Sequence, residues 1–182
     1  MPSPLGHMLG GVAAGWLVSG VPVRGGRHAA ADRVRSAVTY ACLGALPDLD
    51  LLVGVHRGPT HSIGAALIVG IAAGALLYFT GVRRSLLSTT TLAAACGAAF
   101  GSHVLLDWLS HDNSAPIGVM ALWPLERAYY SSDLHVFMAI SRRYYHGWRF
   151  VWQNLVAITR ELAILLPLVS LVVMLRQRRE RR

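Results

Sequence analysis

The chain has 182 residues, of which 54% are hydrophobic and only 14% are charged, and its mean hydropathy is +0.46. A soluble globular domain has about a quarter charged residues, so this composition excludes an ordinary soluble domain and favours a protein embedded in lipid. The net charge of +8 does not indicate nucleic-acid binding, because the arginines gather in short segments between apolar runs, as charges that set membrane orientation do. We therefore expect a single membrane-embedded domain over residues 1–182 and no nucleic-acid partner.

Five apolar segments are long enough, or nearly so, to cross a bilayer, which takes about 20 residues. In chain order they are residues 5–21, 36–53, 63–80, 86–109 and 151–175. The fifth segment contains the adjacent charged residues Arg160 and Glu161, which must face protein or each other at mid-helix. The predicted fold class is therefore an all-α integral membrane bundle of about five transmembrane helices.

The arginines between these segments predict how the bundle is oriented. They lie in the first loop, in the third loop and in a basic tail over residues 176–182, and they include Arg24, Arg27, Arg33, Arg35, Arg83 and Arg84. With five spans these segments share one side, which the positive-inside rule makes cytoplasmic. The N-terminus, the second loop and a long loop over residues 110–150 then face the extracytoplasmic side. The long loop mixes aromatic residues and arginines, which favour the membrane interface.

Histidines and aspartates gather where the apolar runs end. The candidates are His7, Asp48, Asp50, His56, His61, His103 and Asp107. The predicted topology places all of them at the extracytoplasmic face. Ionisable groups at such positions are costly and therefore tend to be functional, and imidazole with carboxylate is a ligand set for zinc, manganese or iron. The sequence thus predicts a metal site at the membrane rim.

The spacing of these residues suits a shared site. His103 and Asp107 are four residues apart and project from one face of a helix. Asp48 and Asp50 do not share a helical face, but Pro47 allows an irregular turn that lines a polar cavity. His61 precedes Ser62, a plausible N-cap of the third helix. Singly, each residue has a plainer interpretation as a solvated loop residue or an ion-pair partner, such as Asp107 with Arg57.

The ordered motifs resemble one family. These are His7 before a Gly-rich apolar helix, Pro47-Asp48-Leu49-Asp50, His56-Arg57-Gly58-Pro59-Thr60-His61-Ser62, His103 to Asp107, and Leu122-Trp123-Pro124. Together they resemble the membrane-bound metal-dependent hydrolase family typified by a LexA-regulated inner-membrane protein, over residues 7–124. This resemblance implies a bacterial cytoplasmic (inner) membrane location and a metal site. The ligand set is also similar, more distantly, to that of zinc-dependent phospholipase C and P1 nuclease.

From these patterns we expect a hydrolase with one to three divalent ions, zinc first, with manganese or iron as alternatives. A metal ion lowers the pKa of bound water and so supplies hydroxide. Substrates within reach of the extracytoplasmic face are membrane lipids and isoprenoid phosphates, cleaved at a phosphoester. We predict Asp50 or Asp107 as the base that takes the proton from water, and Arg57 as the group that binds a phosphate. The alternatives are a non-catalytic membrane protein with a structural or carried metal, and a metal transporter.

Overall fold

The computed structural model describes residues 1–22, 29–54, 56–80, 86–112, 115–141 and 143–181. These residues form α1 (Pro4–Ser19), α2 (Ala29–Ala45), the 3-10 helix η1 (Leu46–Val53), α3 (Ile63–Phe79), α4 (Leu86–Trp108), the 3-10 helix η2 (Tyr144–His146) and α5 (Trp148–Arg181). Extended pairing within the described residues is limited to two isolated bridges in the segment before η2. The all-α prediction is confirmed.

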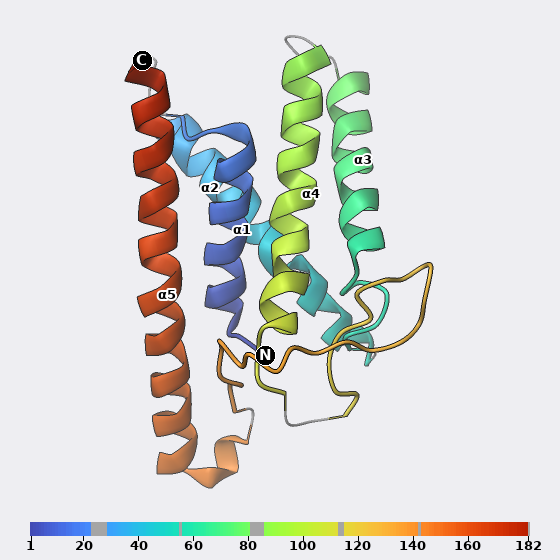
Figure 1. The fold of residues 1–182 in the computed structure, drawn as a ribbon, viewed down its shortest axis with the longest axis vertical. Coiled ribbons are helices and arrows are strands. Elements are labelled where there is room, and N and C mark those ends of the chain that lie inside the picture. Colours follow the sequence, from blue (N-terminus) through green and yellow to red (C-terminus); the bar gives the residue numbers. More distant parts are fainter. Residues whose placement is uncertain (23–28, 55, 81–85, 113–114, 142, 182) are drawn as a thin grey trace.

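The helices run alternately up and down along the long axis of the molecule. In Figure 1, α1, α3 and α5 run in one direction, while α2 and α4 return in the other. The central helix α1 packs against α2, α4 and α5, and α3 packs against α4. The N-terminus, η1 and the segment over residues 115–141 gather at one end, and the C-terminus lies at the other (Figure 1). This alternation brings together the start of α1, the end of α2 with η1, and the end of α4.

The prediction of five spans is not confirmed. Among the described residues, only the stretches Ser88–Trp108 and Trp148–Arg178 are long and apolar enough to cross a membrane, and α3 is a shorter apolar helix. The helices α1 and α2 have 16 and 17 residues, whereas a span takes about 20. The predicted second segment over residues 36–53 divides after Ala45, where α2, which already begins at Ala29, gives way to η1. Pro47 lies in the first turn of η1 and lacks the N–H that an α-helix requires.

Two glycines determine how closely α1 approaches α2. A Cβ atom on Gly11 would lie 2.2 Å from the backbone oxygen of Tyr40, and one on Gly44 would lie 2.3 Å from that of His7. Only glycine fits both positions, as is common where membrane helices touch. Around this crossing, Trp16, Tyr40 and side chains of α4 and α5 form the main apolar core. The crossing fixes the position of His7 relative to the end of α2.

The charged pair in α5 faces protein in part, as expected. Glu161 is 1% exposed and accepts hydrogen bonds from the backbone N–H of Ser3, at 2.7 Å, and from the Ser3 hydroxyl. Ser3 is the N-cap of α1, so α5 and α1 are joined at the end that carries His7. Arg160 is exposed and donates to the backbone carbonyl of His135. The helix α5 also extends the predicted fifth segment at both ends, beginning at Trp148 and including the basic tail as far as Arg181.

Candidate metal centre

Seven candidate ligands from different parts of the chain lie at one end of the bundle. His7 comes from the first turns of α1, Asp48 and Asp50 from η1, and His103 and Asp107 from the end of α4. His56 and His61 come from the segment between η1 and α3. Ser62 caps α3 by accepting from the N–H of Ala65 at 3.0 Å, which confirms the predicted N-cap and fixes His61 next to it. The structure therefore brings together the residues that the sequence singled out.

Four ligand atoms lie close together at the centre of this cluster. The Nε2 atoms of His61 and His103 are 3.0 Å apart. Asp48 Oδ1 lies 3.7 Å from the first of these nitrogens and 3.6 Å from the second. Asp107 Oδ2 lies 3.5 Å and 3.4 Å from the same two nitrogens. Ligands at about 2.1 Å from a tetrahedral zinc ion are roughly 3.4 Å from one another, so the spacing fits one ion.

The hydrogen bonds made by the Nδ1 atoms of His61 and His103 determine which ring nitrogen is available to a metal ion. His103 Nδ1 is 2.8 Å from the backbone carbonyl of Gly44, which can only accept, so Nδ1 carries the proton. His61 Nδ1 is 3.1 Å from the carboxylate of Asp50 and is held in the same way. In their neutral forms both imidazoles therefore carry the lone pair on Nε2, and a proton or a metal ion between the two nitrogens removes the repulsion between these lone pairs. Fixing a histidine ligand through its other nitrogen is typical of metal sites.

His7 extends the cluster on the side of α1. Its Nε2 is 3.4 Å from Asp107 Oδ1, and its ring stacks on that of His103 with 3.6 Å between centroids. His7, His103 and Asp107 form one group that could hold an ion, and Asp48, His61 and His103 form another. Because these two groups share His103, ions held by both of them would lie next to each other.

Several of these atoms are buried without a hydrogen-bond partner. His7, His61 and His103 are 0% exposed. The buried atoms without a partner are His7 Nδ1, His7 Nε2, Asp48 Oδ1, Asp107 Oδ1 and Asp107 Oδ2. A buried polar atom without a partner costs about 1–3 kcal/mol, and more when it is charged. Apart from His7 Nδ1, these atoms lie within 4 Å of another ligand atom of the cluster, so the donor set fits a divalent cation.

Asp50 occupies a different position, behind the converging atoms. Its Oδ2 accepts from the Thr60 hydroxyl at 2.8 Å and from the backbone N–H of Arg57 at 3.2 Å, besides facing His61. Its Oδ1 lies 2.8 Å from His56 Nδ1. Both oxygens are thus engaged within the protein. Asp50, His56 and His61 could also hold an ion, but this arrangement suits Asp50 better as a support that orients His61.

His56 lies at the edge of the cluster, with a side chain that is 18% exposed. Burial lowers the pKa of His56, and this effect outweighs the hydrogen bond to Asp50, which raises it. The imidazole is therefore neutral at neutral pH, which is the form that binds metals.

Arg57 points away from the converging atoms. Its guanidinium forms an ion pair with Asp112 and donates to the backbone carbonyl of Pro116 at 2.6 Å. Its backbone carbonyl accepts from the N–H of Met120 at 3.2 Å, and its φ of 66° is unusual for a residue other than glycine. These contacts join the His56–Ser62 segment to the segment after α4. Binding of a phosphate by Arg57 stays a prediction, and these contacts favour a structural role.

Sequence reasoning missed the roles of three contributors to the centre. The carbonyl of Gly44 and the hydroxyl of Thr60 orient ligands or their supports, and Asp112 pairs with Arg57. A backbone carbonyl leaves no signal in the sequence. Thr60 lies inside the motif His56–Ser62, so its position was visible although its role was not.

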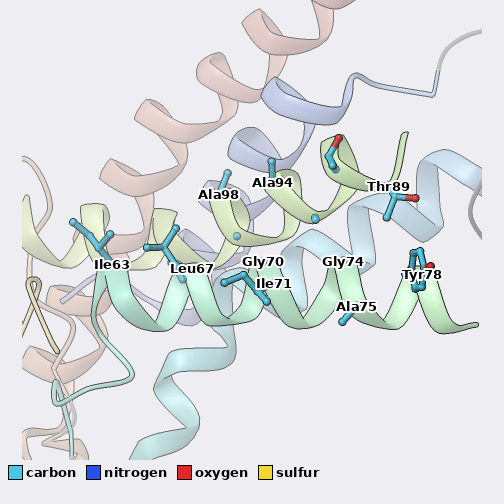
Figure 2. Close-up of a pocket in the computed structure, with 14 residues that line it drawn as sticks. Ile63, Leu67, Gly70, Ile71, Gly74, Ala75, Tyr78, Thr89, Ala94 and Ala98 are labelled. Carbon is cyan, nitrogen blue, oxygen red and sulfur yellow. The ribbon is translucent and has the colours of Figure 1, made fainter. Parts of the chain in front are cut away.

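A large cavity among the described residues is separate from this cluster. It has a volume of about 730 Å³ and lies between α3 and α4, where small residues such as Gly70, Gly74 and Ala94 leave room (Figure 2). Its lining is apolar apart from Thr89, Thr90 and Tyr78, and none of the candidate ligands contributes to it. The site chemistry therefore does not depend on this cavity.

An all-helical fold with apolar, exposed helices and a buried cluster of histidines and aspartates defines the class: a membrane protein with a candidate metal centre. The model of the YdjM inner membrane protein family matches residues 1–180, so the chain belongs to that family. This match confirms the resemblance seen in the sequence and extends it beyond residue 124. No curated relative and no solved structure matches the chain. The more distant similarity to phospholipase C and P1 nuclease is not shown.

Proposed function

We propose that this protein is a membrane-bound, metal-dependent hydrolase that cleaves a phosphoester of a lipid or isoprenoid phosphate at the extracytoplasmic face of the inner membrane. The observation that carries the proposal is the set of buried ligand atoms without hydrogen-bond partners on His7, Asp48 and Asp107, together with the facing Nε2 atoms of His61 and His103. A shared proton could satisfy the two imidazoles alone. It would leave the other atoms without partners, whereas a divalent cation serves all of them.

We expect the ligands to be His61, His103, Asp48 and Asp107, with His7 completing the centre or binding a second ion. Zinc suits a site of imidazole and carboxylate, and manganese or iron would be accommodated by the same donors. A bound divalent ion supplies acidified water for hydrolysis. Asp107 has one oxygen toward His61 and His103 and the other toward His7, so one oxygen can bind the ion while the other accepts a proton, whereas both oxygens of Asp50 are engaged elsewhere.

Access to the centre favours a catalytic over a purely structural metal. The side chain of Asp48 is 16% exposed, while those of His7, His61, His103 and Asp107 are fully enclosed. A substrate would therefore approach from the side of η1. Catalytic metal sites keep an open position, whereas structural sites are closed, and Asp48 marks where that opening would be.

The surroundings of Asp48 favour a lipid as the substrate. On the same short helix η1, Leu49 is 55% exposed and Leu52 is 83% exposed. Exposed leucines next to a polar site suit the boundary between headgroups and acyl chains. A phosphorylated headgroup at that depth would reach Asp48 without leaving the bilayer.

The test is hydrolysis by purified protein in detergent of a panel that contains phosphatidic acid, phosphatidylglycerol and an isoprenyl phosphate. We expect phosphate or headgroup release that chelator abolishes and that zinc or manganese restores. The variant His61→Ala should lose both activity and metal. His146→Ala changes an exposed histidine of η2, outside the candidate ligands, and should keep both.

Two results would contradict the proposal in different ways. Folded, metal-loaded protein that releases nothing from the panel would favour the alternative of a structural or carried metal. Folded protein that contains no transition metal and binds none on titration would exclude a metal function of either kind.

A further inference from the structure

A smaller cavity lies outside the metal centre. It has a volume of about 280 Å³ and is lined by His111, His135, Phe137, Met138, Ala139, Gln153 and Arg160. None of its lining residues in the described part of the chain carries a carboxylate, and none belongs to the groups that could hold a metal. The polar side chains of this lining are therefore cationic or N–H-donating, and no acidic side chain accompanies them among the described lining residues.

Arg160 is the only permanent cation among those lining residues. It lies in α5 within the apolar stretch Trp148–Arg178, where an arginine is costly unless it meets a polar group. One N–H donates to the backbone carbonyl of His135 at 3.1 Å, which leaves most of the five donors of the guanidinium. The neighbouring residue Glu161 does not neutralise it, because its carboxylate is turned inward to Ser3.

Two histidines face Arg160 from the segment after α4. The rings of His111 and His135 meet edge to face with 4.8 Å between centroids. His111 is held through its backbone, because its N–H donates to the carbonyl of Phe137 at 2.8 Å. Each imidazole offers at least one N–H donor in either protonation state. Gln153 donates to the carbonyl of Ala139 and so helps to hold the wall.

We propose that this cavity binds an anionic phosphate group, with Arg160 as its main contact and His111 and His135 as additional donors. Arginine and N–H donors around a small cavity are the chemistry that recognises phosphate. None of the lining residues belongs to the groups that could hold a metal, so the phosphate would be bound by side chains other than those of the metal centre. The inference goes beyond the proposed hydrolysis, because binding here requires neither the metal nor a reaction.

The test measures binding to the full-length protein in detergent with chelator present, so that the metal centre does not contribute. The probes are dihexanoyl phosphatidic acid, dihexanoyl phosphatidylcholine and inorganic phosphate, followed by isothermal titration calorimetry. We expect phosphatidic acid to bind, and phosphatidylcholine, whose phosphate is offset by choline, to bind much more weakly. Competition by inorganic phosphate would indicate that the phosphate group alone is recognised, and lack of competition would indicate that the cavity takes a lipid headgroup.

Two variants distinguish binding in this cavity from nonspecific attraction of an anion to a basic protein. Arg160→Gln should weaken phosphatidic acid binding by about tenfold or more, which is the order of one charge-assisted hydrogen bond. Arg127→Gln removes the same charge from an exposed arginine that does not line the cavity, and its affinity should stay within about twofold of the wild type. A thermal melt of each variant establishes that it is folded.

A second variant keeps the test informative if Arg160→Gln does not fold. His135→Gln keeps an N–H donor but changes the shape of the cavity, and it leaves Arg160 in place. It should weaken binding by a smaller factor than Arg160→Gln. Equal affinity of wild type and folded Arg160→Gln, or equal binding of phosphatidic acid and phosphatidylcholine, would overturn the proposal, whatever the outcome of the hydrolysis assay.

Discussion

Asp50 and Asp107 are both buried carboxylates beside His61, but they differ in what surrounds their oxygens. Asp50 accepts from Thr60 and from the backbone of Arg57 and faces two imidazole Nδ1 atoms. Both oxygens of Asp107 lack hydrogen-bond partners and face only imidazole Nε2 atoms. The first environment is that of a residue that orients a ligand, and the second is that of a ligand.

This difference predicts unequal losses of metal affinity. Changing a residue that orients a ligand costs about 10- to 100-fold in metal affinity, so we expect a loss of this size for Asp50→Asn. Asp107→Asn removes a ligand charge and should cost more, leaving the purified protein largely without metal. Competitive titration with a zinc indicator gives both affinities. Equal losses for the two variants would mean that Asp50 is itself a ligand.

At the scale of single residues, the sequence predicted which side chains meet but not what each one does. His103 and Asp107 are four residues apart on a helix, and their closeness follows from that spacing alone. The role of Asp50 depends on where His56, His61 and Thr60 lie in three dimensions. Arg57 illustrates the same limit, because its partner Asp112 lies 55 residues away and pairs with it only after folding.

At the scale of elements, the α1–α2 crossing holds the metal centre together. Gly11 and Gly44 touch at backbone distance, and next to this contact His7 enters the centre and the carbonyl of Gly44 orients His103. A side chain at the crossing would separate the two helices. The separation would move a ligand on α1 and the orienting carbonyl on α2 at once.

Gly11→Ala tests this dependence. The new methyl group would lie 2.2 Å from the backbone oxygen of Tyr40, and overpacking of this kind costs about 1–3 kcal/mol. We therefore expect a lower melting temperature and weaker metal binding. Gly74→Ala is the matched control, because its methyl group meets only the side chain of Ala93, at 3.2 Å. A normal metal affinity in Gly11→Ala would show that the crossing does not position the centre.

The helix limits show where sequence patterns suffice. The predicted third and fourth segments agree with α3 and α4 to within one residue at each end, because Ser62 supplies a cap and the apolar runs are continuous. The second segment was wrong in detail. Its apolar composition does not reveal that α2 ends at Ala45 and that η1 begins at Leu46, just before Pro47. That change is functionally important, since the 3-10 geometry of η1 directs both Asp48 and Asp50 toward His61.

At the scale of the whole molecule, the alternating helices divide the charged groups between two ends. The candidate ligands lie at the end that holds the N-terminus and η1, and the C-terminal end of α5 lies at the other (Figure 1). The start of α2, with exposed Arg33 and Arg35, also lies at the end away from the ligands. The predicted loop arginines Arg24, Arg27, Arg83 and Arg84 fall outside the described residues, but they lie in the connections α1–α2 and α3–α4.

This division predicts the orientation in the membrane. Short arginine-rich connections stay on the cytoplasmic side, so the ends of α3 and α5 should be cytoplasmic and the metal centre extracytoplasmic. Fluorescent-protein and alkaline-phosphatase fusions after Thr80 and after the C-terminus should give fluorescence without phosphatase activity. A fusion after Ala128, in the segment that follows α4, should give the opposite result and serves as the internal control.

Phosphatase activity from both of the first two positions, with fluorescence after Ala128, would reverse the orientation and move the centre to the cytoplasmic face. The same signal at all three positions would mean that α4 does not cross the bilayer, although its stretch Ser88–Trp108 is long and apolar enough to do so.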